Sequence, residues 1–332
     1  MIQSKLVFLK ISVMFLMMVI GWWCARWQYL TTTLTKALSL LVVQVTFPAL
    51  VFVQMLETVS FASLQRGWWI PVFGGVSIVL AALVGKGLIG FFRVPPESRK
   101  TFVFLVALPN WVFLPLPIAA GLYGAEGVRF VLLLNFGAQI TLWTYGIRLL
   151  QDGEAEKQSA WRMLLSNSGV LATLVGAGLA LCWPGIAAPA DSDSGLVWGL
   201  TINSVLGALK MIGDLTIPLS LLVAGAQLAE LMRSSQFQWR PLSGVILARL
   251  VVAPLVTLLA LKAVTLLIGV RLTEVEFITS TVIVSMPVAI SCSMFADHYN
   301  GDRGLTASSI FLTTLLSLLT VPAAVWCCHW LL

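Results

Sequence analysis

The polar residues of this chain that could bind a ligand stand beside prolines inside apolar runs. Residues 106–124 read VALPNWVFLPLPIAAGLYG, so Pro109, Asn110 and Pro117 interrupt an otherwise apolar stretch. A proline in a helix interior costs about 3 kcal/mol, because it lacks a donor and clashes with the preceding turn. An asparagine amide has two donors and an acceptor, which suits it to orient a carboxylate. We expect Asn110 to contact a ligand, and the same side chain could also cap a carbonyl that Pro109 leaves free.

Three charged residues lie inside later apolar runs, where ionisable side chains are functional candidates because an isolated charge in hydrocarbon is costly. Lys210 and Asp214 stand four residues apart and can meet on one helix face, and Arg249 lies in the next run. We expect these residues to form a charge network or to couple an ion or a proton. The alternatives are a self-neutralised Lys210–Asp214 pair, an Arg249–Asp214 pair, and an Arg249 that neutralises a bound anion or reaches the membrane surface with its long stem.

Two uncharged residues are further candidates to line a binding site. Asn135 lies in the run that follows residues 106–124, and Ser291 flanks a second interruption, which is marked by Pro287. Amides and hydroxyls that face neighbouring helices often only hold those helices together. Both interpretations stay open for each residue.

The elements that must position these residues are membrane-spanning helices. Of the 332 residues, 59% are hydrophobic and only 10% are charged, whereas a soluble domain carries about 25% charged residues. Apolar runs of about 20 residues are each long enough to cross about 30 Å of hydrocarbon. The sequence therefore predicts an all-α polytopic membrane protein with ten spans, at 6–25, 34–56, 68–90, 101–121, 127–149, 163–183, 198–228, 241–269, 275–296 and 305–331.

The ten spans divide into two units that resemble each other. A charged connection at 151–162 separates a first unit, 1–150, from a second, 163–332. Pro109 interrupts the fourth span of the first unit, and Pro287 interrupts the fourth span of the second. Because five spans is an odd number, the second unit must enter the membrane inverted. Interrupted spans at matching positions of inverted repeats are typical of secondary transporters, where they mark the binding site.

The basic residues predict the orientation. Connections that follow odd-numbered spans carry most of the Lys and Arg, whereas connection 184–197 has only Asp191 and Asp193 as charged residues. The positive-inside rule then places the odd-numbered connections in the cytoplasm and both termini outside, for a protein of the plasma membrane, or the inner membrane of a bacterium. No basic cluster indicates a nucleic-acid partner.

Broken helices create polar groups at a depth where lipid would otherwise forbid them. Irregular backbone survives in hydrocarbon only where protein buries it or where it lines a cavity. Half-helix N-termini offer free N–H groups and partial positive charge, which suit an anion, whereas C-terminal ends offer carbonyls. We expect the breaks of the fourth and ninth spans to meet near mid-membrane around a polar site. A single kinked span would need no such explanation.

The interrupted spans also carry recognisable motifs. In combination they resemble the auxin efflux carrier family, which includes the plant PIN carriers, over essentially all ten spans. The residues that carry the resemblance are Leu108-Pro109-Asn110, Pro117 and Tyr123-Gly124; Gly213-Asp214 and Gly225; Arg249 and Pro254; and Met286-Pro287, Phe295-Ala296 and Tyr299-Asn300.

The resemblance implies a fold of the bile acid symporter type and a secondary transporter that works by an elevator mechanism. It implies a scaffold made of spans 1, 2, 6 and 7 and a transport domain made of spans 3–5 and 8–10, in which broken helices 4 and 9 cross beside the substrate. Asn110 falls on the family's substrate-contacting asparagine, and Pro117 on its crossover proline. The expected partners are a small organic anion, auxin-like or dicarboxylate-like, and membrane lipid, with H⁺ or Na⁺ coupling and a homodimer left open.

Two other functions are compatible with parts of the sequence. A sodium- or proton-coupled symporter or antiporter of the same fold would usually carry carboxylates at the crossing, and the cores of the fourth and ninth spans have none. An intramembrane enzyme is a weaker alternative, because Gly213-Asp214 lacks both the first glycine of an aspartyl protease motif and a partner aspartate. The two histidines and five cysteines lack the spacing of a metal site, so we expect no metal, no cofactor and no enzymatic activity.

Overall fold

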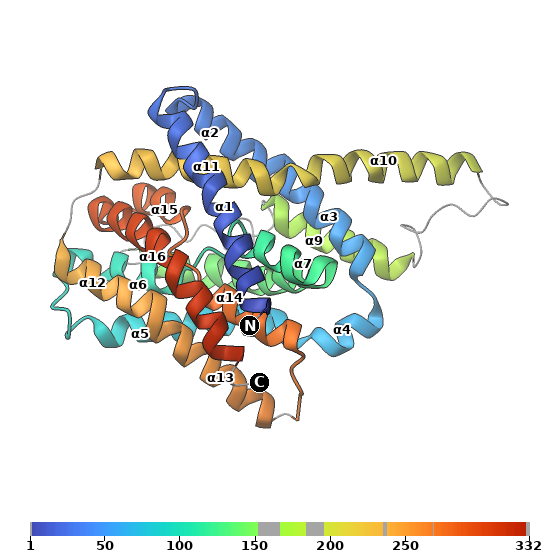
Figure 1. The fold of residues 1–332 in the computed structure, drawn as a ribbon. Helices are drawn as coiled ribbons and strands as arrows, with labels where there is room; N and C mark the ends of the chain where they lie inside the picture. The colour runs from blue at the N-terminus through green and yellow to red at the C-terminus, as the bar shows by residue number, and fades with distance from the viewer. Residues whose placement is uncertain (1, 152–166, 184–195, 235–237, 268, 330–332) are drawn as a thin grey trace.

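The regular structure of the described chain is helical. The computed structural model describes residues 2–151, 167–183, 196–234, 238–267 and 269–329, so most of the predicted connection at 151–162 lies outside the described residues. Within the described part the only β-type contact is one isolated antiparallel bridge, between Pro109 and Val288. The protein is therefore a helical assembly, drawn in Figure 1.

The helices lie mostly within the ranges of the predicted spans, and several of these ranges contain two helices in series. The count of ten spans and their inverted repeat stay predictions. In the first part of the chain they are α1 (Ile2–Arg26), α2 (Thr32–Leu41), α3 (Phe47–Thr58), α4 (Phe61–Gly67), α5 (Trp69–Leu88), α6 (Arg99–Ala107), α7 (Pro115–Thr141) and α9 (Ser168–Cys182). They continue with α10 (Leu196–Asp214), α11 (Thr216–Ser234), α12 (Trp239–Leu247), α13 (Ala253–Leu267), α14 (Glu274–Val284), α15 (Cys292–His298) and α16 (Arg303–His329). Shorter 3-10 or π segments join some of them: η1 (Val42–Thr46), η2 (Pro96–Ser98), η3 (Leu142–Gly146), η4 (Ile147–Leu149) and η5 (Ala248–Val252).

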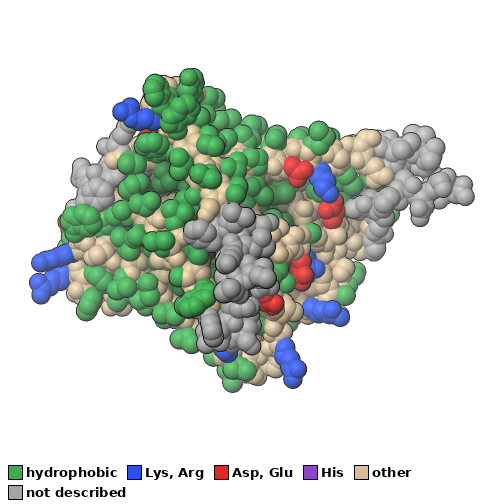
Figure 2. Space-filling view, viewed as in Figure 1, with side chains coloured by type: hydrophobic (Ala, Val, Ile, Leu, Met, Phe, Trp, Pro, Cys, Tyr) green, Lys and Arg blue, Asp and Glu red, His purple; other side chains and the backbone are tan. Residues whose placement is uncertain are grey.

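Length and composition support the membrane assignment. Figure 2 shows many hydrophobic side chains on the face in view, most densely on its left part, whereas charged side chains lie mainly at its margins and on its right part. Within the described residues, the apolar helix Ser168–Cys182 is shorter than a full span. Six helical runs are long and apolar enough to cross a membrane: Thr32–Thr58, Phe61–Leu88, Pro115–Leu149, Ile202–Glu230, Trp239–Leu267 and Arg303–Cys328.

The two predicted spans that contain Pro109 and Pro287 are each broken in two. The first break separates α6 from α7, and the second separates α14 from α15. The predicted boundary between the fourth and fifth spans falls inside α7, at Gly124. This residue has φ 58° and ψ −139°, a backbone conformation that favours glycine because it has no Cβ. The chain turns there from the second half of the broken span into the next one.

The helices pack in two sets whose members approach closely. In one set α1 lies along α11, and α3 lies along α9 and α10; in the other, α5 packs on α6 and α7, and α14 packs on α7 and α16. The two sets also touch each other, since α16 packs on α11 and α7 packs on α3. Glycines allow the closest approaches. A Cβ on Gly225 would overlap the carbonyl oxygen of Met18, and a Cβ on Gly137 would overlap the carbonyl oxygen of Pro71. Such backbone contacts hold membrane helices together by dispersion rather than by the hydrophobic effect.

Two further prolines are accommodated by π-helical segments rather than by breaks. Pro48 and Pro254 each follow a π segment, η1 or η5, by two residues. A proline lacks the N–H that would bond the carbonyl four residues earlier, and its ring clashes with that carbonyl. The carbonyls concerned belong to Gln44 and Leu250, which are the middle residues of the two π segments. The wider π turn therefore absorbs the clash while the helix continues.

We expect the close approach of α9 to α3 to be sensitive to one added methyl group. A Cβ at Gly176 would lie 2.8 Å from the Phe52 carbonyl oxygen, whereas a Cβ at Gly178, on the same helix, meets nothing within 4 Å. Gly176→Ala should lower the melting temperature in detergent, since overpacking costs about 1–3 kcal/mol. Gly178→Ala should leave it unchanged or raise it, because alanine favours the helix. Equal melting temperatures for the two variants would contradict this packing.

Candidate functional site

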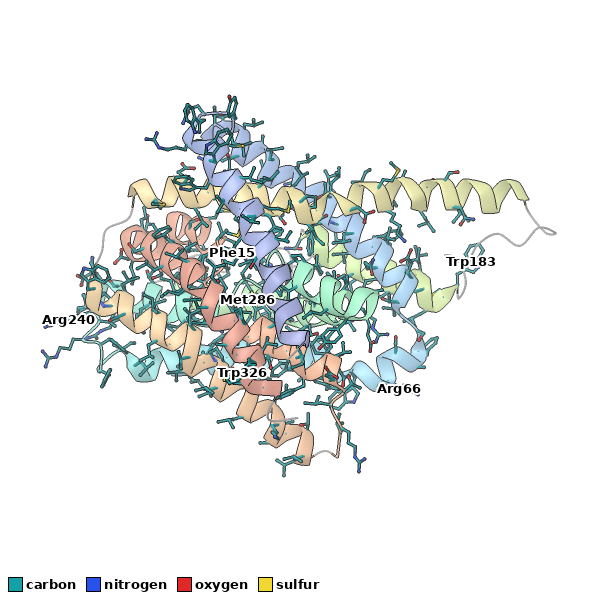
Figure 3. The ribbon with its side chains drawn as sticks, viewed as in Figure 1. Phe15, Arg66, Trp183, Arg240, Met286 and Trp326 are labelled. Atoms are coloured by element: carbon teal, nitrogen blue, oxygen red, sulfur yellow. The ribbon has the colours of Figure 1, made fainter. Side chains whose placement is uncertain are left out.

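The two broken spans cross each other in antiparallel direction. The Asn110 backbone N–H donates to the Pro287 carbonyl at 2.8 Å, and the Ala289 N–H donates to the Leu108 carbonyl at 3.1 Å. Each break therefore supplies hydrogen-bond partners for backbone groups that the other break leaves without a helix, as the absence of water in hydrocarbon demands. The prediction that the breaks meet is confirmed. Met286 marks the second break in Figure 3, well inside the molecule, whereas Arg66 and Arg240 lie at its periphery.

A cavity of about 150 Å³ lies beside this crossing. The two breaks and the start of α15 border it. The other walls are faces of three helical segments: α2 with η1, α7 with η3, and α11. Its lining residues are Ser39, Val42, Val43, Leu108, Pro109, Asn110, Trp111, Val112, Phe113, Asn135, Gln139, Leu142, Ser220, Val223, Ala224, Gln227, Ala289, Ile290, Ser291, Ser293 and Met294. No residue of this lining carries a formal charge, so its polar groups are amides, hydroxyls, an indole and backbone.

The two ends of the Asn110 amide have different roles at the crossing. Its side chain is 4% exposed, and its Oδ1 accepts a hydrogen bond from the Phe113 backbone N–H at 3.1 Å. The predicted capping role is therefore real, although the capped group is a freed N–H rather than a carbonyl. Because the acceptor is engaged in this way, the two N–H donors of Nδ2 are the part of the amide left for a ligand.

Two other buried polar atoms of the lining have no hydrogen-bond partner in the described structure. The Asn135 Oδ1 is an acceptor and the Trp111 Nε1 is a donor. Both side chains are less than a tenth exposed, at 7% and 8%. Buried polar atoms are usually paired, so orphans such as these mark places where a ligand or water completes the structure.

The structure brings most of the predicted ligand-site residues together. Pro109, Asn110, Asn135 and Ser291 line the cavity. Pro287 lies directly behind the lining, where its carbonyl accepts the Asn110 N–H. Pro117 lies in the first turn of α7 and is buried, but it does not line the cavity.

The part of the lining that comes from α2 and α11 was not among the residues predicted from the sequence. Ser39 on α2 and Ser220 and Gln227 on α11 border the cavity. A signal was present in the spacing, because Ser220 and Gln227 stand seven residues apart, as do Asn135 and Leu142, and such residues share one helix face. The spacing alone does not say which face meets a cavity.

Arg249 is completely enclosed at the crossing. Its side chain is 2% exposed, and its Nη1 donates to the Val106 carbonyl at 2.7 Å while its Nη2 donates to the Val284 carbonyl. These carbonyls belong to the last turns of α6 and α14, the helices that end at the two breaks. The predictions that Arg249 pairs with Asp214 or reaches the membrane surface are therefore wrong, because its guanidinium is used to cap two helix ends.

The predicted pairing of Lys210 with Asp214 is also wrong. The Lys210 Nζ lies 3.2 Å from the Glu57 Oε1 of α3, with the two side chains 55% and 36% exposed. Asp214 is exposed and, like Lys210, does not line the cavity. The i, i+4 spacing permitted the contact, but the packing of α10 on α3 brought a closer carboxylate.

Comparisons with known proteins place this chain among membrane transport proteins. A family model described as "Membrane transport protein" matches residues 6–169 and 170–326. The chain is 24% identical over 327 residues to an uncharacterized transporter, MJ1031, of Methanocaldococcus jannaschii, covering 95% of this chain and 97% of the relative.

Two further relatives are similar to this chain. An uncharacterized transporter of Methanothermobacter thermautotrophicus is 24% identical over 294 residues, covering 86% of this chain and 87% of that protein. Protein PIN-LIKES 2 of Arabidopsis thaliana is 25% identical over 127 residues, covering 35% of this chain and 28% of the relative. With a family model matching nearly the whole sequence, this chain belongs to the membrane transport protein family, the family of the auxin efflux carriers that its motifs resemble.

Proposed function

We propose that this protein is a secondary carrier that moves a small organic anion across the plasma membrane by alternating access, with the cavity at the crossing as its substrate site. The observation that carries the proposal is an uncharged, amide-bearing cavity placed where two broken helices meet. The relatives are named as two uncharacterized transporters and a PIN-like protein, and these names support a transport function. They do not identify a substrate, so the substrate class is argued from the cavity.

The position of the cavity supports an elevator movement. Its lining comes on one side from α2 with η1 and from α11, and on the other from the two breaks and α7. The first side belongs to a set held by the α1–α11 and α3–α9 contacts, and the second to a set held by the α5–α7 contact. We assign the first set to a scaffold of spans 1, 2, 6 and 7, and the second to a transport domain of spans 3–5 and 8–10, within two inverted repeats of five spans.

The chemistry of the lining favours an anion that must also be released. The Asn110 Nδ2 and the Trp111 Nε1 are neutral donors, and neutral donors hold a carboxylate less tightly than a basic side chain would. An apolar cavity of about this volume can hold a benzene-sized molecule. A small carboxylate with one apolar ring, or a short dicarboxylate, matches both the donors and the space.

The direct test is uptake into proteoliposomes that contain the purified protein. Labelled benzoate, phenylacetate and succinate, offered under an imposed membrane potential, represent one-ring monocarboxylates and short dicarboxylates. We expect saturable uptake of at least one of them above that of protein-free liposomes, and uptake in media without Na⁺ or without a pH gradient tests coupling to either ion. Uptake of cations or neutral solutes in place of every carboxylate would contradict the proposal.

We expect Asn110→Asp to separate structural capping from substrate binding. The aspartate keeps an acceptor for the Phe113 N–H but replaces the donors of Nδ2 with a negatively charged oxygen. Since a hydrogen bond to a charged group is worth about 1.5–3 kcal/mol, affinity for the carboxylate should fall at least about tenfold. The melting temperature should also fall at neutral pH, because the new carboxylate is buried where Asn110 is 4% exposed. It should recover at low pH, where the protonated side chain still accepts the Phe113 N–H. Asn110→Ala should lose both affinity and stability. Asn203→Ala, on α10 and outside the lining, is the matched control. Wild-type uptake by Asn110→Asp would remove Asn110 from the site.

We expect Asn135→Leu to raise stability and lower transport at the same time. Leucine has the same branching and the same number of side-chain heavy atoms, and it removes the orphaned Oδ1, whose burial without a partner costs about 1–3 kcal/mol. The melting temperature without ligand should rise, whereas carboxylate uptake should fall. Gln139→Leu, in the same helix and lining but without an orphaned atom, should not raise the melting temperature. A fall in both readouts for Asn135→Leu would show that the amide is part of the packing.

A further inference from the structure

Arg249 joins two chain segments that occupy equivalent places in the two halves of the sequence. Its carbonyl partners are Val106 and Val284, and each stands three residues before the proline of its own break, Pro109 or Pro287. The guanidinium thus lies where the C-terminal ends of α6 and α14 converge. A planar guanidinium with a fixed fork of donors can reach two carbonyls at once.

The charges at this point balance without a carboxylate. The C-terminal end of a helix carries about −0.5 elementary charge, so two converging ends offer about −1 to the single positive charge of the guanidinium. None of the ion pairs in the described part of the chain joins Arg249 to an acidic residue. The buried charge is therefore held by backbone dipoles.

We infer that Arg249 is a built-in cation for the crossing, which holds the place that a bound monovalent cation would otherwise have to fill. Two helix C-termini that face one another offer carbonyl oxygens, here those of Val106 and Val284, and carbonyl oxygens are ligands that a hard cation prefers. With the guanidinium in that place, the crossing keeps its shape in every step of the cycle without Na⁺. Arg249 is thus a positioning residue, and the inference rests on the proposed carrier function only for its effect on transport.

Removing the guanidinium has a consequence for the substrate site. Leu108 lines the cavity and is only two residues beyond Val106, so the freed carbonyls would lie close to the substrate. Without Arg249 the uncompensated helix ends present negative potential there. The site would then repel an anion and recruit a cation from solution.

The test is chemical rescue of Arg249→Ala. We expect this variant to transport carboxylate at least about tenfold more slowly than the wild type and to melt at a lower temperature, because breaking a buried charge interaction is strongly destabilising. Millimolar guanidinium chloride should raise both its melting temperature in detergent and its uptake, with a smaller effect of NaCl. The wild type should transport equally well when K⁺ replaces Na⁺ and should not be stabilised by guanidinium.

Matched variants keep the test decisive. Arg240→Ala changes an exposed arginine at the start of α12 and should show no rescue. Arg249→Gln keeps a hydrogen-bond donor but lacks the charge, and it serves as the test if the alanine variant does not fold. We expect it to transport slowly and not to respond to guanidinium, because the glutamine side chain fills the space. Arg249→Lys should retain part of the activity.

Several results would overturn the inference. These are wild-type rates in Arg249→Gln, a wild-type requirement for Na⁺, or an alanine variant that folds and yet gains no stability from guanidinium. The melting temperature does not depend on transport. Stabilisation of Arg249→Ala by guanidinium, together with a wild type that carries no carboxylate, would therefore sustain the built-in cation and refute the proposed function.

Discussion

A backbone N–H or C=O without a partner is costly in hydrocarbon, and the crossing of the two broken spans answers that constraint. The prolines at positions 109 and 287 end regular helix in the membrane interior, and the freed groups then bond across the crossing, from Asn110 to Pro287 and from Ala289 to Leu108. Arg249 satisfies two more carbonyls at the ends of α6 and α14. Each break is tolerable only because the other is there, which ties the two halves of the chain to one point.

The rest of the fold holds this point in place. Close backbone contacts such as Gly137 against Pro71 fix α7 to α5, and Gly225 against Met18 fixes α11 to α1. The π segments serve the same site, because η1 and η3 contribute cavity-lining residues and η5 carries Arg249. Local departures from α-helical geometry therefore gather around the crossing, as they commonly do at functional sites.

For the anion carrier proposed above, the polar groups of the crossing would let an uncharged cavity suit a charged solute. Arg249 donates to the carbonyls of two helix ends and does not line the cavity, so the proposal gives it no direct contact with the substrate. Neutral donors from Asn110 and Trp111 remain for the ligand, and neutral donors permit release as well as binding. A carrier needs that balance, because a site that holds its substrate too firmly cannot complete a cycle.

The sequence by itself determined the membrane class, the helix breaks at Pro109 and Pro287, and Asn110 as the amide beside them, because hydropathy, proline chemistry and side-chain donors are local properties. Only the tertiary structure decided which groups these side chains contact. Arg249 reaches a carbonyl 143 residues away, Lys210 pairs with Glu57 across 153 residues, and Ser220 turns toward the cavity from the opposite set of helices. Helical spacing states which residues share a face, but long-range packing selects the neighbour that the face meets, and no single stretch of sequence contains that information.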